Sequence, residues 1–359
     1  MIVNLFIDRG NGLAKTITVL GDMSASNVDA QSPKPQKHPS LIREVAGEGI
    51  KIPGRKVNYV FGNRTLINKQ GRAFSTLEER SKTAYIEIVV ADLIHQAIPE
   101  GSSEDIELNL ICSSPFSSTA DDINPLVSEI KSRLQALSRG FSVNGVEYGK
   151  VQPQRIGVMP EGLSLLDCDH NYNGVIDLGL GTLLAGYQDP LKGVRNLPLT
   201  GGDTGGCQTW LQAVLNDGDF LKDVADKGFT AAPSPEKLCQ LLGNARWDIK
   251  GVDFVKYLKR YAEPVVIRVE NAAKTLRSTL SFADPDNEVE PSIAMIGGGA
   301  SLFSKILSNE QHDQLTELGV DIFGHLPDLQ TVLMLEQAFR RNPERFKSFT
   351  KKRSEKVGA

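Results

Sequence analysis

The sequence predicts an α/β fold with two similar domains, and three observations lead to this. Segments typical of β-strands alternate with amphipathic helical segments along the chain. A hairpin whose first strand ends in an aspartate occurs twice, at Asp8 and, about 170 residues later, at Asp177. The chain has 359 residues, more than a single hydrophobic core usually serves. We therefore expect two related domains that face one another across a cleft.

The strands are predicted from short apolar runs bounded by turn residues. They occupy residues 3–7 and 14–20 around the turn DRGNG, 105–114, two stretches around the Asn-Gly pair within 141–162, a second hairpin at 174–188, and 292–296. Residues 24–40 are polar and contain prolines, which predicts a loop. Residues 41–74 carry short strand signals divided by Gly and Pro, which indicates a small inserted subdomain.

Helices are predicted where apolar residues recur at a spacing of three and four. They occupy residues 75–98, 124–140, the segment after the glycine-rich stretch 200–206, residues 252–280 with a bend or interruption near Pro264, the segment after glycines 297–299, and 328–341. The basic run 347–356 is expected to be a solvated tail.

Composition limits the class of function. The chain is 40% hydrophobic and 23% charged, which is typical of a globular protein. A formal net charge of -4 argues against direct nucleic-acid binding by the molecule as a whole. No apolar stretch approaches the ~20 residues of a membrane span, and the N-terminus carries no cleavable signal, so we expect a cytoplasmic protein without membrane contact. The four cysteines form no zinc or redox spacing.

The stretch DCDHNYNGVIDLGLGT, residues 167–182, fits two chemistries. Asp169, Asn171 and Asn173 have the spacing of a calcium-binding loop. The twelfth position of that loop requires a bidentate carboxylate, and it is occupied by Leu180. The apolar continuity that follows is also typical of a strand rather than a helix. A degenerate calcium site therefore stays the minor alternative, and the three polar residues are interpreted as turn formers.

The same stretch fits a phosphate-binding turn better. Gly179 and Gly181 allow backbone N–H groups to approach an anion, and Thr182 adds a hydroxyl donor. Asp177 at the strand end is suited to hold Mg²⁺ through water. The spacing Asp-x-Gly-x-Gly-Thr is only moderately specific, because any tight hairpin can contain it.

The order of three motifs along the chain is more specific. FIDRGNGLAKTI places Asp8, Gly10 and Lys15 on the first hairpin, VIDLGLGT follows, and MIGGGASLF comes last. This series resembles the first phosphate loop, the second phosphate loop and the adenosine loop of the actin superfamily. The likeness is greatest to the prokaryotic ParM/StbA plasmid-segregation actins, which share the spacing of the first loop and the VMPE strand ending at Glu161. Leu180 and Leu183 depart from that pattern, where relatives carry glycine and threonine.

The resemblance implies an actin-like fold, with two similar RNase H-like α/β domains flanking a nucleotide cleft. The expected domain I spans 1–165 with the inserted subdomain at about 31–75, and domain II spans 166–326. Residues 327–359 are expected to form a helix that returns to domain I and the basic tail. The inserted subdomain matches no part of the family pattern.

The resemblance also implies roles for the charged residues, each beside a plainer interpretation. Asp8 and Asp177 would share the water shell of Mg²⁺; alternatively each caps a hairpin turn. Lys15 would contact the β- and γ-phosphates; alternatively it is an exposed strand lysine. Glu161 would orient the attacking water and be a catalytic residue together with Asp8 and Asp177; alternatively it is a solvated loop residue.

The remaining candidate positions are backbone donors and contacts to the nucleoside. The phosphates would be bound by Gly10, Asn11, Gly12, Gly179, Gly181 and Thr182, and the purine side by Gly297, Gly298 and Gly299 at a helix start. Glu236 lies where actin-like proteins often place a ribose-contacting carboxylate, although Ser-Pro-Glu is also a common helix start. An ordinary Asn-Gly turn is the alternative for Gly10, Asn11 and Gly12.

The function that these expectations favour is a filament-forming actin-like ATPase that uses ATP, or GTP, with Mg²⁺. Its partners would be further copies of itself, in head-to-tail contact, and a DNA-binding adapter for plasmid or DNA segregation, with no direct nucleic-acid contact. One alternative is a metabolic kinase of the same superfamily that acts on a sugar or a carboxylic acid. Another is a cytoskeletal scaffold for cell shape or division.

Overall fold

The structure of the chain is a computed structural model. It describes residues 1–10, 13–23, 34–67, 70–75, 83–114, 120–169, 171–191, 193–199, 206–229, 233, 238, 241–242, 246–283, 290–322 and 329–348. Within these residues, none of the helices combines the length and the apolar character that crossing a membrane requires.

The first half of the chain is built on a six-stranded sheet in the order β19-β11-β8-β1-β2-β3. Its strands are β1 (Ile2–Arg9), β2 (Leu13–Leu20), β3 (Gln36–Pro39), β8 (Ile106–Ser114), β11 (Val151–Pro160) and β19 (Lys347–Ser348). β1 pairs antiparallel with β2 and parallel with β8, which in turn pairs parallel with β11. The predicted N-terminal hairpin and the predicted strand 105–114 are therefore confirmed.

Two short strands of this sheet correct the sequence predictions. β3 lies inside the predicted loop 24–40 and pairs antiparallel with β2. β19 begins the predicted tail and pairs with β11. Both segments lack strand propensity of their own, and they extend because a neighbouring strand edge supplies hydrogen-bond partners.

A second six-stranded sheet has the order β10-β9-β5-β6-β4-β7. Its strands are β4 (Leu41–Val45), β5 (Ile50–Lys51), β6 (Asn58–Phe61), β7 (Ala73–Ser75), β9 (Phe141–Val143) and β10 (Val146–Tyr148), and α1 (Arg64–Ile67) follows β6. The predicted inserted segment supplies only four of these strands. The other two come from residues 141–148, whose turn has positive φ at Asn144 and Gly145, as a two-residue hairpin requires.

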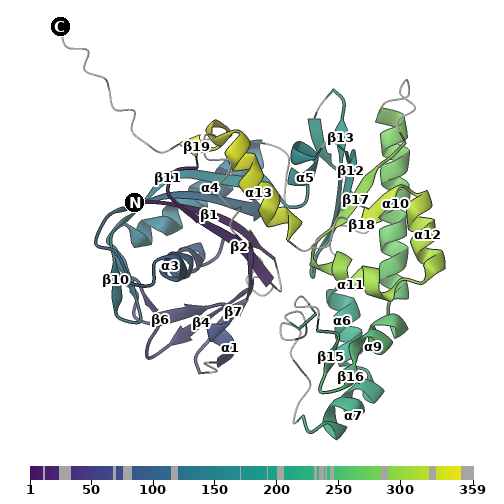
Figure 1. The fold of residues 1–359 in the computed structure, drawn as a ribbon, viewed down its shortest axis with the longest axis horizontal. Helices are drawn as coiled ribbons and strands as arrows, with labels where there is room; N and C mark the ends of the chain where they lie inside the picture. Colours follow the sequence, from purple (N-terminus) through teal and green to yellow (C-terminus); the bar gives the residue numbers. More distant parts are fainter. Residues whose placement is uncertain are drawn as a thin grey trace.

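Helix α3 (Ile86–Ala97) lies between the first and the second sheet (Figure 1). Every residue from Ile86 to Ile94 is buried, which is typical of a helix covered on all sides. Its two buried carboxylates, Glu87 and Asp92, pair with arginines from the second-sheet side. Of the helix predicted over 75–98, the structure shows α3 at Ile86–Ala97, and residues 76–82 lie outside the described part of the chain.

The second half has a five-stranded sheet in the order β14-β13-β12-β17-β18. Its strands are β12 (Gly174–Leu178), β13 (Leu183–Asp189), β14 (Gly193–Asn196), β17 (Ile293–Ile296) and β18 (Val320–Ile322). As in the first sheet, a hairpin is extended by an antiparallel strand on one side and by two parallel strands on the other. The duplication predicted from the two aspartate hairpins is thus a duplication of sheet topology.

Helices pack on these sheets, mostly where apolar periodicity predicts them. They are α4 (Ala120–Leu134), α5 (Ser164–Cys168), α6 (Gln208–Leu215), α7 (Gly218–Asp226), α9 (Phe254–Arg260), α10 (Glu263–Ala283), α11 (Gly298–Ile306), α12 (Asn309–Glu317) and α13 (Gln330–Arg341). A short ribbon, β15 (Asp248–Ile249) with β16 (Val252–Asp253), precedes α9. The predicted interruption near Pro264 is confirmed, because Pro264 lies in the first turn of α10, where a missing N–H leaves no hydrogen bond unmade.

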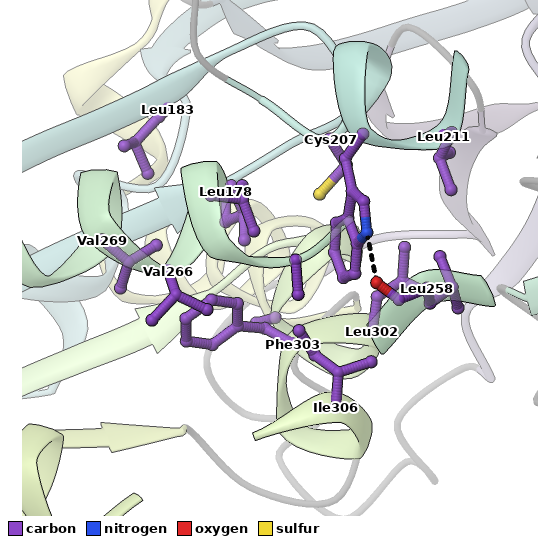
Figure 2. Close-up of a cluster of buried hydrophobic side chains, with 14 of the residues drawn as sticks. Leu178, Leu183, Cys207, Leu211, Leu258, Val266, Val269, Leu302, Phe303 and Ile306 are labelled. Carbon is purple, nitrogen blue, oxygen red and sulfur yellow. Dashed lines mark hydrogen bonds between the residues drawn. The ribbon is translucent and has the colours of Figure 1, made fainter. Parts of the chain in front are cut away.

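The core of the second half lies under its hairpin. Leu178, at the end of β12, and Cys207, which precedes α6, belong to one buried cluster with Phe303 of α11 (Figure 2). The indole N–H of Trp210 donates to the carbonyl of Leu258 at 2.8 Å, which joins α6 to α9. This cluster anchors the turn after β12, because Leu178 at the end of β12 is one of its buried members.

A separate buried cluster joins the two halves. It contains Phe6 of the first sheet and Ile296 of the second, together with Leu335 and Phe339 of α13. The rings of Phe6 and Phe339 meet edge to face with centroids 5.7 Å apart. α13 follows the second half in the sequence yet packs on the first sheet (Figure 1). The domain boundaries at 165 and 326 stay predictions.

The buried imidazole of His38 on β3 makes the fold sensitive to pH. Burial lowers the pKa of His38, so the folded state holds the neutral ring. Because the unfolded chain takes up the proton near its ordinary pKa of about 6.5, this contribution to stability is complete above that pH and is lost as the pH falls toward the folded pKa. We predict that His38→Gln reduces the difference in free energy of unfolding between about pH 7.5 and about pH 5.5.

Urea denaturation at the two pH values measures this difference. His312→Gln, at an exposed position of α12, is the matched control and should keep the wild-type difference. An unchanged difference in His38→Gln would show that His38 does not carry the effect.

Candidate functional site

The candidate site lies where strands of both halves end. Asp8 lies near the end of β1, Ser113 near the end of β8, Glu161 directly after β11, Asp177 in β12 and Gly297 directly after β17. In parallel α/β sheets, ligands bind at the carboxyl ends of the strands. These residues, all of them except Ser113 predicted from the sequence, therefore occupy the edge at which such sheets place their sites.

Lys15 is the centre of charge at this edge. Its ammonium Nζ lies 2.8 Å from Oδ2 of Asp8, and both side chains are buried. The other oxygen of Asp8 accepts a hydrogen bond from the hydroxyl of Ser113. Burial alone would lower the pKa of Lys15, but Asp8, with Glu161 and Asp177 further away, raises it above its ordinary value. Lys15 is thus a permanent cation among three carboxylates, and the exposed-lysine alternative is wrong.

Asp177 is enclosed by two glycines from different loops. A Cβ at Gly162 would lie 2.8 Å from the Cβ of Asp177, and one at Gly297 would lie 2.3 Å from its Oδ1. Both glycines have positive φ, 70° and 93°. The loop after β11 and the loop after β17 therefore meet around the carboxylate at the end of β12.

The turn between β12 and β13 is held by the start of α6. The N–H groups of Cys207 and Gln208 donate to the carbonyls of Gly179 and Leu180 at 3.0 and 2.7 Å. Across the turn, the N–H of Gly179 donates to the carbonyl of Thr182 at 2.9 Å. Gly206 lies so close that a Cβ there would meet three backbone atoms of the turn within 2.6 Å. The glycine at position 206 thus allows the backbone before α6 to lie directly against the backbone of the turn.

The two leucines that depart from the family pattern have a packing role. Leu180 packs against the core of the second half, and Leu183 in β13 is 3% exposed. Gly179, Gly181 and Thr182 are half-buried at the surface of the turn. Since the apolar side chains face inward, the departures leave the backbone of the turn accessible.

Glu161 is a buried residue. It is 7% exposed, and its N–H donates to the carbonyl of Ser114 at 2.7 Å. Its charge contributes to raising the pKa of Lys15, which places it near the cation. The solvated-loop alternative for Glu161 is therefore wrong.

The three glycines after β17 differ from one another. A Cβ on Gly299 would meet Sγ of Cys207 and Cγ of Leu178, each at 2.6 Å, so this glycine permits close packing of helix and strand. A Cβ on Gly298 would meet no atom within 4 Å. The first and third glycines are thus required by packing, whereas the second leaves open space at the helix start.

The structure brings together six predicted residues, drawn from both halves. They are Asp8, Gly10, Lys15, Glu161, Asp177 and Gly297. Asn11, Gly12 and Glu236 lie outside the described residues, and their predicted contacts stay predictions.

Two side chains that the calcium interpretation of residues 167–182 requires as ligands instead accept hydrogen bonds from backbone N–H groups. Oδ1 of Asp169 accepts the N–H of Asn171 at 3.0 Å, and Oδ1 of Asn173 accepts the N–H of Ser292 at 2.8 Å. These are turn and cross-strand contacts, as expected for turn formers. In the part of the chain that the structure describes, no group of three or more His, Cys, Asp or Glu side chains is arranged to hold a metal.

Three residues that contribute to the site were not predicted. Ser113 orients Asp8, Gly162 makes room for Asp177, and Gly206 makes room for the second turn. Two serines directly after the apolar run of residues 106–112 are a usable signal, because polar residues at strand ends often face a site. The roles of the glycines depend on contacts between distant segments, which no local pattern contains.

Solved structures match the fold over most of the chain. A structure described as "pCBH ParM non-polymerisable quadruple mutant" matches with a TM-score of 0.60 at 15% identity, covering 95% of this chain and 100% of that one. The archaeal actin homolog Ta0583 in complex with ADP matches with a TM-score of 0.55 at 16% identity, covering 96% and 100%. The MamK double helical filament matches with a TM-score of 0.53 at 14% identity, covering 94% and 99%.

No protein-family model matches the sequence, and no curated protein sequence matches it. The chain nevertheless has an actin-like fold, with two similar α/β halves. The fold is similar to that of the ParM structure, among others. The fold class implied by the motif order is confirmed.

The contrast between Gly297 and Gly298 gives a test of the site geometry. Gly297→Ala forces a side chain into a positive φ and against Asp177, so we predict that the free energy of unfolding falls by about 2–4 kcal/mol. Gly298→Ala is the matched control. It meets open space and restricts the unfolded chain, so it should raise stability by about 0.5 kcal/mol. Urea denaturation measures both, and equal effects would contradict the enclosure of Asp177.

Proposed function

We propose that this chain binds ATP with Mg²⁺ at the candidate site, hydrolyses it, and assembles into filaments. The observation that carries the proposal is the cationic Lys15 among three carboxylates from both halves of the chain. A lysine ammonium binds phosphate as a point charge. The resemblance of the three loops to the phosphate and adenosine loops of actins supports ATP as the ligand, with GTP as the alternative nucleotide.

The residues fit a magnesium nucleotide. Mg²⁺ keeps several waters and is bound by one or two carboxylates together with substrate phosphates, so a dedicated cluster of protein ligands is not required. Asp8 and Asp177 are the carboxylates that would hold it through water. When bound, Mg²⁺ neutralises charge that develops on the phosphates. Ser113 keeps the carboxylate of Asp8 in one orientation while Lys15 turns from Asp8 toward a phosphate.

Glu161 is proposed to orient the attacking water. Its carboxylate is buried close to Lys15, and its backbone is fixed by the hydrogen bond to Ser114. A fixed carboxylate accepts a hydrogen bond from water and aligns it for attack. Phosphoryl transfer depends mainly on such positioning and on electrostatic stabilisation.

Filament formation is proposed because solved structures that share the fold include filament-forming proteins. The MamK structure is a double helical filament, and the ParM structure is of a variant made non-polymerisable. A head-to-tail contact between identical subunits does not close and therefore produces a filament. Because the formal net charge is -4, DNA segregation would use a DNA-binding adapter rather than direct contact.

Assembly is the first prediction of this proposal. With ATP and Mg²⁺, light scattering should rise above a threshold protein concentration, because assembly requires a nucleus. Electron microscopy with a non-hydrolysable ATP analogue should show filaments. Asp177→Ala is the control and should lose the response to nucleotide.

A metabolic kinase would give a different result. It would consume ATP only when a second substrate is present to accept the γ-phosphoryl group, at all protein concentrations and without scattering. That outcome would replace the filament proposal while leaving the nucleotide site in place.

Glu161→Gln tests the catalytic assignment. The amide keeps the size of the side chain but is a poorer acceptor for the attacking water, so ATP hydrolysis should slow by about 100-fold with ATP affinity nearly unchanged. Phosphate release and equilibrium nucleotide binding measure the two quantities. If the main effect is a loss of affinity, Glu161 holds the nucleotide rather than the water.

A further inference from the structure

Arg9 is a buried cation beside the site that the proposed function does not use. It is the last residue of β1 and is 2% exposed. Since side chains alternate along a strand, Arg9 points to the face opposite that of Asp8. In register it lies across from Ala14, whereas Asp8 lies across from Lys15. Arg9 therefore points away from a ligand on the Asp8 face.

On its own face, Arg9 reaches the start of α3. A guanidinium Nη1 donates to the buried carbonyl of Ala84. The next residue, Tyr85, has a φ of 58° and precedes the first turn of α3. A tyrosine adopts this left-handed conformation only where its surroundings hold it there. Arg9 thus bonds the end of β1 to a conformationally restricted segment.

That segment is itself fixed to the second sheet. The ring of Tyr85 packs on Phe74 of β7 with centroids 4.7 Å apart and on Tyr59 of β6 with centroids 6.2 Å apart. The guanidinium of Arg55 lies 5.9 Å from the same ring. The carbonyl that accepts the hydrogen bond from Arg9 therefore belongs to a rigid part of the molecule.

We propose that Arg9 is a positioning residue for the nucleotide site. It bonds the end of β1 to α3 on one face, and this fixes the place of Asp8 and Gly10, which act on the other face. A charged guanidinium suits this role, because its hydrogen bonds are stronger than those of neutral donors and it keeps its charge when buried. The inference rests on the proposed function, since it assigns Arg9 to the same nucleotide site.

Arg64 supplies a matched control. It also binds α3, because its Nη1 lies 3.5 Å from Oδ1 of Asp92. Its Nη2 lies 2.7 Å from Oδ1 of Asn144, in the turn between β9 and β10. It extends from α1 in the second-sheet region, and neither bond involves the first hairpin. Removing Arg64 therefore removes an arginine contact to α3 without releasing β1.

The experiment compares Arg9→Met, Arg9→Lys and Arg64→Met in the full chain. ATP affinity is measured by equilibrium titration, and amide hydrogen exchange of residues 2–20 and 83–97 is followed without nucleotide. We expect Arg9→Met to bind ATP about tenfold more weakly, because ATP binding must then also order the end of β1 that Arg9 holds in the wild type. The amide of Gly10, which donates to Leu13, should exchange faster in that variant. Arg9→Lys keeps a charged donor, so it should recover part of the ATP affinity and part of the protection of the Gly10 amide. Arg64→Met should match the wild type in ATP affinity and in exchange at Gly10.

The outcomes separate this inference from the proposed function. If folded Arg9→Met binds ATP like the wild type, or if Arg64→Met is equally weakened, the positioning role is wrong. If Arg9→Met does not fold, Arg9→Lys decides: wild-type affinity or wild-type exchange at Gly10 overturns the role, whereas a partial loss of affinity together with faster exchange at Gly10 supports it. If the wild type does not bind ATP, the proposed function fails. Exchange at Gly10 in the nucleotide-free variants then decides whether Arg9 holds the end of β1.

Discussion

The shared apolar cluster between the two halves is the constraint on which the site depends. α13 follows the second half in sequence but packs on the first sheet, where Phe339 meets Phe6. The same cluster contains Ile296, the residue directly before Gly297. Because packed apolar side chains tolerate little displacement, this contact sets the distance between the strand ends of the two sheets. Without it, each half would carry only part of the site.

The site contains one buried cation and three carboxylates, so its charges are unequal in number. One ammonium, Lys15, faces Asp8 closely and Glu161 and Asp177 at greater distance. The three carboxylates outnumber the ammonium, so the site carries excess negative charge that a bound cation would reduce. With that cation and Lys15 present, an anionic ligand can also bind. Such a cluster is suited to a metal-bound phosphate, in which positive and negative charge arrive as a unit.

The two faces of β1 carry side chains with different roles. Asp8 and Lys15 face the site, whereas Arg9 faces α3 and the second sheet. The second sheet is assembled from two distant parts of the chain, residues 41–75 and 141–148, and it encloses α3 between itself and the first sheet. The hairpin end is thus positioned by a region that does not take part in the proposed chemistry. The position of Asp8 on one face of β1 therefore depends on the packing of Arg9 on the other face.

The sequence alone determined the alternation of strands and helices, the two aspartate hairpins and the order of the three loops, because these follow from local periodicity and turn chemistry. It also placed Lys15 and Glu161 among the candidates. Only the tertiary structure decided that both are buried together, that β3 forms from a polar segment, and that Gly162 and Gly297 enclose Asp177. These features depend on contacts between segments far apart in the chain, and a local pattern of residues contains no record of which distant atoms it will meet.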